Sequence, residues 1–185
     1  MAEIARAERQ TALDGRQGGT AKARITLSPP ATRINLRAGE EAVSGLSAAL
    51  GLTLPRQPKT SASKDTRLAL WLGPDEWLVI DENDATLMEA CAGSGTIHSA
   101  TDVSHRNIGF SIAGPTAAHA LNAACPLDLS PKAFPVGSCA RTVFGKIEIV
   151  LYRYADDAFR LECWRSFADY AFGLLEEGAA DALTL

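Results

Sequence analysis

The sequence predicts an α+β fold built from two ferredoxin-like halves. Three observations carry this prediction. The apolar runs follow the order strand, helix, strand, strand, helix twice along the chain, two tryptophan-bearing runs flank a tight reversal at residues 73–75, and the chain closes on an amphipathic helix. Antiparallel hairpins with helices on one side of each sheet are typical of this class.

The N-terminal residues 1–31 show little periodic hydrophobicity and contain a cluster of glycines. We therefore expect a flexible arm, followed by one α+β domain over residues 32–185. A few apolar residues of the arm could anchor it to a partner, namely Ile4, Leu13, Ile25 and Leu27. A second polar stretch at 55–65, rich in Pro, Lys, Ser and Thr, is expected to be an exposed loop.

The first half begins with an alternating strand at 32–36 and a helix at 40–50, which Gly51 ends as a left-handed stop. Residues 67–72 and 76–80 are apolar runs on either side of a Gly-Pro-Asp reversal, so they should pair as an antiparallel hairpin. A helix is predicted around 86–92 and a new extended segment at 96–99.

The second half repeats this order. Residues 102–112 are predicted as one strand, and Gly114-Pro115 starts a helix. Three further strands are expected, at 139–144, 147–154 and 158–164. The last helix begins at a capping box of Ser166 and Asp169 and ends before Gly178. Its predicted buried stripe consists of Phe167, Tyr170, Ala171, Leu174 and Leu175.

Composition limits the classes of function. Apolar residues make up 46% and charged residues 22%, and the formal net charge is −4 without a dense Lys/Arg run, which argues against a nucleic-acid partner. No apolar stretch approaches the roughly 20 residues of a membrane span. The four cysteines form no CxxC pair, so we expect them to be buried, reduced thiols. Reduced thiols are typical of the cytoplasm, which is the predicted location.

The search for chemistry predicts no catalytic, cofactor-binding or metal residue in this chain. The histidines at 98, 105 and 119 lack metal-ligand spacing, and no glycine-rich dinucleotide loop is present. The acidic run at 81–84 could chelate a cation or polarise an amine, but such a run after a strand is usually a solvated turn.

Tryptophan and arginine are the residue types most enriched at interface hot spots. Two tryptophans lie on the arms of the predicted hairpin, and a Trp-Arg pair ends the last strand. The interface candidates are therefore Trp71, Trp77, Trp164 and Arg165. The opposing interpretation is that these aromatic side chains belong to the core, because large aromatics also dominate interiors.

Four stretches in order carry a family resemblance: LALWLGPDEWLVI at 68–80, DVSHRNIGFSIAGPTAAHALNAACPLDL at 102–129, FPVGSCARTVFGKIEIVLYR at 134–153 and FRLECWRSFADYAFGLLEEGA at 159–179. Together they resemble the gamma-subunit family of heterotetrameric bacterial sarcosine oxidase. The resemblance implies a fold similar to the folate-binding domain of aminomethyltransferases and the related YgfZ-type proteins.

The resemblance also implies a division of labour. A complex of this family oxidatively demethylates sarcosine to glycine with hydrogen peroxide and, with tetrahydrofolate, yields methylene-tetrahydrofolate. FAD, FMN, NAD, tetrahydrofolate and zinc are expected in the alpha, beta and delta partner subunits. This chain would then be a non-catalytic subunit of an oxidoreductase, acting in assembly and scaffolding. The alternative is a stand-alone folate-binding or aminomethyltransferase-like protein that uses Asp81 or Asp84 to orient an amine.

Overall fold

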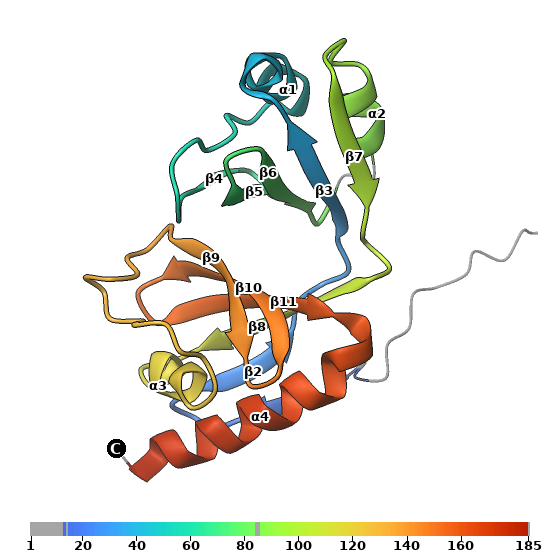
Figure 1. Cartoon of the computed structure of the whole chain (residues 1–185). Coiled ribbons are helices and arrows are strands. Elements are labelled where there is room, and N and C mark those ends of the chain that lie inside the picture. The colour runs from blue at the N-terminus through green and yellow to red at the C-terminus, as the bar shows by residue number, and fades with distance from the viewer. Residues whose placement is uncertain (1–12, 14, 84–85, 185) are drawn as a thin grey trace, which may run out of the picture.

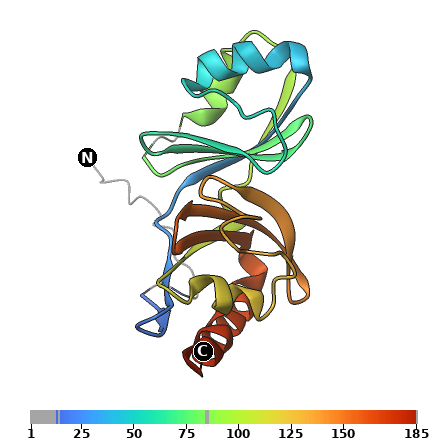
Figure 2. The same ribbon diagram turned by 90° about the vertical axis from the view of Figure 1, so that its left-hand side faces the viewer.

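The computed structural model describes residues 13, 15–83 and 86–184. Two β-sheets face each other in the middle of the molecule, with one pair of helices outside each sheet, so the structure has four layers (Figure 1). The view turned by 90° shows the same layers, with the C-terminal helix at the end opposite the first pair of helices (Figure 2).

The first half holds a five-stranded antiparallel sheet in the order β4-β5-β6-β3-β7. Its strands are β3 (Thr32–Ala38), β4 (Ser61–Lys64), β5 (Arg67–Gly73), β6 (Glu76–Asp81) and β7 (His98–Asp102). Its helices are α1 (Val43–Leu50), which follows the 3₁₀ turn Glu40–Ala42, and α2 (Leu87–Ala92). Gly51 takes a left-handed conformation with a φ of 63°, as predicted for the end of α1.

The second half holds a six-stranded sheet in the order β1-β2-β8-β11-β10-β9. Its strands are β1 (Gln17–Gly19), β2 (Arg24–Leu27), β8 (Asn107–Ala113), β9 (Cys139–Phe144), β10 (Ile147–Ala155) and β11 (Ala158–Trp164). Its helices are α3 (Ala117–Asn122) and α4 (Ala168–Asp181), and α4 lies between the 3₁₀ turns Arg165–Phe167 and Ala182–Thr184.

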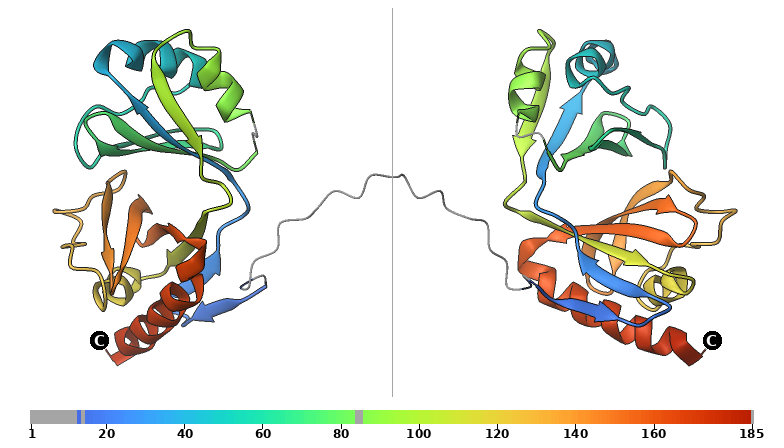
Figure 3. Two further views of the ribbon diagram at one scale, coloured as in Figure 1. Left: turned by 45° about the vertical axis from the view of Figure 1, so that its right-hand side comes forward. Right: turned by 180° about the vertical axis from the view of Figure 1, so that it is seen from behind.

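Both halves have the ferredoxin-like strand plan, but the second half completes it differently. In the first half, β7 lies beside β3 and follows it in the chain. In the second half the equivalent place beside β8 is taken by β2, which precedes the whole first half in sequence. Figure 3 shows β2 running along β8 in the lower sheet. The predicted fold of two similar α+β halves is confirmed.

The predicted flexible arm is therefore wrong over residues 17–27, which form β1 and β2. Ile25 pairs with Ile112 of β8 and is fully buried, and Leu13 is buried in the same core. These apolar side chains serve the chain's own core and are not free to anchor a partner. Residues 1–12, including Ile4, lie outside the described residues.

Two further boundaries differ from prediction. The predicted strand at 102–112 is two strands in different sheets, because the chain turns at residues 104–106 as it crosses from β7 to β8. The predicted loop at 55–65 contains β4, which pairs with β5 at the edge of the first sheet. Both segments use polar residues where tertiary pairing decides the structure.

The buried face of α4 also differs from the predicted stripe. Phe167 and Tyr170 are exposed, and the buried residues of α4 are Ala168, Ala171, Phe172, Leu175, Gly178 and Ala179. A Cβ at Gly178 would come within 2.3 Å of the Ala120 carbonyl oxygen of α3. Close helix approach therefore selects the face with small residues. No capping hydrogen bond from a side chain starts α4, so the predicted capping box is wrong.

Three apolar clusters stabilise these layers. One lies between each sheet and its helices, and the third lies between the two sheets. None of the described helices is long and apolar enough to cross a membrane.

Candidate subunit interface

The junction between the two sheets is closed by an apolar layer and a buried ionic cluster. The apolar layer joins side chains of β5 and β6 in one sheet to β9 and β10 in the other, including Leu70, Leu78 and Val150. The Cys139 thiol of β9 donates a hydrogen bond to the Thr60 carbonyl oxygen across the junction, with 3.1 Å between the sulfur and the oxygen. The two halves therefore pack as one body.

The ionic cluster centres on Glu162 of β11. Arg33 of β3 donates to both oxygens of this carboxylate, through Nε at 2.7 Å and Nη2 at 3.1 Å, and Arg160 donates a further bond of 2.7 Å. Arg160 also pairs with Glu82 at 2.7 Å. Arg33 and Glu162 are almost completely buried and come from different sheets. This cluster fastens the two halves together.

Local sequence makes room for the cluster. Glu162 lies opposite Gly109 of β8, and a Cβ at Gly109 would come within 2.6 Å of the Glu162 carboxylate. Burial by itself would raise the pKa of the Glu162 carboxyl, but the positive charges of Arg33 and Arg160 outweigh it, so this pKa lies below its usual range. Glu162 is therefore ionised at neutral pH and serves the structure.

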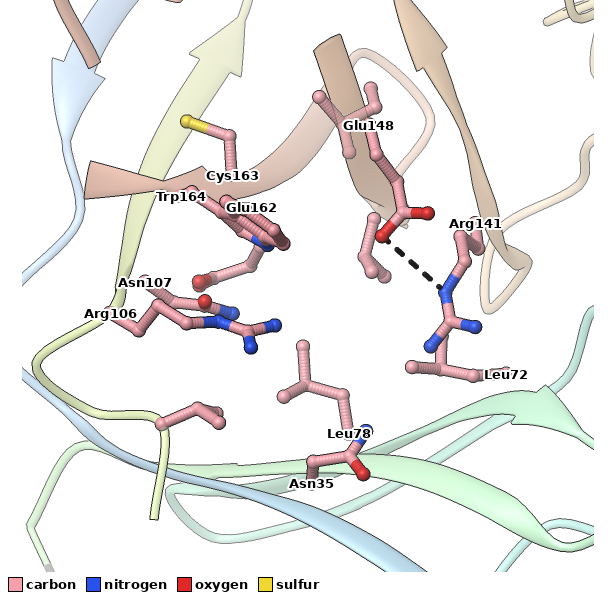
Figure 4. Close-up of a pocket in the computed structure, with 13 residues that line it drawn as sticks. Asn35, Leu72, Leu78, Arg106, Asn107, Arg141, Glu148, Glu162, Cys163 and Trp164 are labelled. Atoms are coloured by element: carbon pink, nitrogen blue, oxygen red, sulfur yellow. Dashed lines mark ion pairs between the residues drawn. The ribbon is translucent and has the colours of Figure 1, made fainter. Parts of the chain in front are cut away.

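A narrow cleft opens beside this junction (Figure 4). Arg106 and Arg141 project into it from opposite sides, and Asn35 and Asn107 add polar groups. Arg141 pairs with Glu76 at a nitrogen–oxygen distance of 2.5 Å and lies 3.9 Å from Glu148. The cavity volume is about 40 Å³, which holds only a few water molecules at about 10–15 Å³ each.

At the mouth of the cleft, three side chains form what we call the Arg106 platform: Arg106, Trp164 and Phe167. The Arg106 guanidinium lies over the Trp164 ring at 4.6 Å from its centroid. The Phe167 ring stacks against Trp164 with centroids 6.0 Å apart. Trp164 and Phe167 are 42% and 38% exposed, which is unusual for such large apolar groups and is typical of an interaction surface.

The four predicted interface residues separate into three environments. Trp77 is a core residue at 1% exposure, and its Nε1 donates to the Pro55 carbonyl oxygen at 2.7 Å, so it cannot contact a partner. Trp71 is half-buried between two apolar clusters. Trp164 and Arg165 lie at the surface, and their contact with a partner stays a prediction.

Sequence reasoning missed Arg106 and assigned Phe167 to the core. Arg106 lies in the turn between β7 and β8, far from Trp164 in sequence, and its carbonyl oxygen accepts a hydrogen bond from the Arg165 backbone N–H at 2.6 Å. This bond holds the turn against the end of β11. A signal was present for Phe167, because it flanks the alanine- and glycine-rich stripe of α4 rather than lying in it.

Asp81, proposed above as an amine-orienting residue, is buried and pairs with Arg67 at 2.9 Å, and Asp84 lies outside the described residues. No cluster of metal-ligating side chains occurs among residues that the structure describes. The four cysteines are buried free thiols, as predicted. Burial raises the pKa of Cys139 and Cys163 to about 12, which keeps these thiols protonated.

Comparison with known proteins assigns this architecture. The model of the sarcosine oxidase, gamma subunit family matches residues 37–181. The sarcosine oxidase subunit gamma of Arthrobacter sp is 32% identical over 149 residues, covering 77% of this chain and 73% of that protein. The subunit gamma of Corynebacterium sp. (strain P-1) is 32% identical over 145 residues, covering 76% and 71% respectively.

Solved structures agree. A chain of the heterotetrameric sarcosine oxidase from Corynebacterium sp. U-96, in complex with pyrrole 2-carboxylate, superposes with a TM-score of 0.83 at 26% identity, over 90% of this chain and 88% of that chain. The glycine cleavage system aminomethyltransferase T from Bartonella henselae has a TM-score of 0.65 at 15% identity, over 84% of this chain and 45% of that one. The second match confirms the predicted aminomethyltransferase-like fold. The chain belongs to the sarcosine oxidase gamma subunit family.

Proposed function

We propose that this chain is a non-catalytic subunit that assembles with the other subunits of a heterotetrameric sarcosine oxidase and stabilises their arrangement. The observation that carries the proposal is the match to a chain of such a heterotetramer over nine-tenths of this chain. The exposed Arg106 platform supports it, because large exposed aromatic groups beside an arginine favour a protein contact.

In this proposal the chemistry belongs to the partners. The alpha, beta and delta subunits hold FAD, FMN, NAD, tetrahydrofolate and zinc, and the complex converts sarcosine to glycine in the cytoplasm with hydrogen peroxide and methylene-tetrahydrofolate as further products. The buried carboxylates Asp81 and Glu162 support a structural role for this chain, because each is bound to arginine. A carboxylate held this way is not available as a general base.

Co-purification tests the proposal. An affinity tag on this chain, co-expressed with its genomic neighbours, should recover a flavin-containing complex that oxidises sarcosine. Expression of the tagged chain alone is the control and should give a protein without flavin absorption or sarcosine oxidation. Failure to recover any flavin-containing partner would contradict the proposal. Binding of tetrahydrofolate by the chain alone would instead favour the stand-alone folate-binding alternative.

A further inference from the structure

The charges that line the cleft are unequally matched. Glu162 is bound by Arg33 and Arg160, and Arg141 lies between Glu76 and Glu148. Arg106 has no carboxylate partner anywhere in the part of the chain that the structure describes, although it lies beside these satisfied pairs. An arginine without an acid at the edge of a cleft is electrostatically complementary to an incoming carboxylate.

The surroundings of Arg106 add two further requirements. Trp164 and Phe167 have exposed rings, and burying this apolar surface under a partner would favour binding. Asn107 lines the same cleft, and its Oδ1 atom is buried and accepts no hydrogen bond from the described residues. A buried acceptor without a donor is unfavourable, so an occupant with an N–H group would stabilise this side chain.

The size of the cleft identifies the class of occupant. Pockets for small molecules usually enclose about 300–1,000 Å³. The cleft beside Arg106 has a cavity volume of about 40 Å³, which suits the tip of one side chain. Trp164 lines the cleft and the Phe167 ring stacks against it, so a residue next to the one that enters the cleft would reach these exposed rings. These features fit a protein segment better than a free ligand.

We propose that the Arg106 platform binds an acidic segment of a partner subunit of the oxidase. An Asp or Glu side chain of that segment pairs with the Arg106 guanidinium, an adjacent apolar side chain covers Trp164 and Phe167, and an N–H group donates to Asn107 Oδ1. The inference rests on the proposed function, because it specifies the surface by which this subunit is held. Of the three tryptophans predicted as interface candidates, this proposal places only Trp164 at the contact.

The test uses the co-expressed complex and three variants of the tagged chain. Mass photometry over a dilution series measures the Kd between this chain and the remaining subunits. We expect Arg106→Glu to raise that Kd by at least about 30-fold, which is a hot-spot magnitude, and Trp164→Ala to raise it by about tenfold. The matched control is Arg24→Glu, which makes the same charge change at an exposed residue of β2 and should alter the Kd by less than about threefold.

Salt dependence distinguishes the ion pair from packing alone. The wild-type Kd should rise with ionic strength, and this dependence should weaken in Arg106→Glu but persist in Trp164→Ala. If the Arg106→Glu chain binds the remaining subunits with the same Kd as the wild-type chain, this inference is overturned and the proposed function is unaffected. If the isolated chain forms a dimer and Arg106→Glu dissociates that dimer, the inference is also overturned, because the Arg106 platform would then bind a second copy of this chain. A wild-type chain that recovers no partner defeats both proposals.

Discussion

Two arginine sites at the junction of the sheets differ in what surrounds them. Arg33 is buried, and the Glu162 carboxylate binds it through two hydrogen bonds. Arg106 is exposed, lies over Trp164, and meets no carboxylate among the described residues. Burial of an unpaired charge is unfavourable, so a buried arginine needs a carboxylate partner from the same chain. An exposed arginine is solvated by water and can pair with a carboxylate of another chain. The difference separates a structural site from a binding site.

The largest effect should come from breaking the buried site. Glu162→Gln leaves Arg33 and Arg160 buried without their shared carboxylate, and we expect a loss of about 3–5 kcal/mol in the free energy of unfolding. Urea denaturation followed by circular dichroism measures it. The control is Glu148→Gln, at a glutamate whose side chain is 60% exposed, where less than about 0.5 kcal/mol should be lost. Equal stabilities would show that the cluster does not hold the halves together.

A smaller loss should follow from crowding the same carboxylate. Gly109→Ala places a methyl group within 2.6 Å of Glu162 and 3.1 Å of Ser28, and we expect destabilisation by about 1–3 kcal/mol. Gly173→Ala is the matched control, because Gly173 lies inside α4 with open space around it and should gain about 0.5–1 kcal/mol. Thermal unfolding compares the two variants. If Gly109→Ala leaves the stability unchanged, β8 and β11 can move apart at little cost in free energy.

Acid should weaken the buried site gradually. The folded-state pKa of Glu162 lies below its usual value of 4.5, so its contribution to stability is complete above that pH and is lost as pH falls through the folded-state pKa. The stability difference between the wild type and Glu162→Gln should therefore narrow as the pH falls from about 7 to about 3. Denaturation curves at several pH values measure this difference. A constant difference would assign the effect of the variant to packing.

The smallest effect on the isolated chain is expected at the exposed site. Trp164→Ala removes one exposed ring and one cation–π contact, so the free energy of unfolding should fall by less than about 1 kcal/mol. Trp77→Ala, in the core, should lose about 3–5 kcal/mol and provides the comparison. Unfolding of the free chain by Trp164→Ala would show that this tryptophan is also structural.

The sequence predicted the order of strands and helices because periodic hydrophobicity is a local property. It could not predict β2, whose burial depends on pairing with β8 far along the chain. Nor could it separate Trp77 from Trp164, because both lie in apolar strands and only the facing layers distinguish them.

The Arg106 platform was the least predictable feature. It forms where the turn between β7 and β8, which carries Arg106, contacts the end of β11, which carries Trp164. No residue spacing in the sequence predicts this contact. Family resemblance, by contrast, was visible in four ordered stretches, and the match over residues 37–181 confirms it.

The placement of β2 beside β8 also bears on how the chain is made. The ribosome delivers β2 long before β8, because β8 begins at Asn107, 80 residues after β2 ends at Leu27. At about 5–20 residues per second, translation takes roughly 4–16 s to cover that distance. The strands between 32 and 102 can pair among themselves in that time, because none of their sheet partners lies outside that interval. The nascent chain therefore exposes the β8-facing edge of β2, whose other edge can pair with β1, while an independent sheet forms behind it.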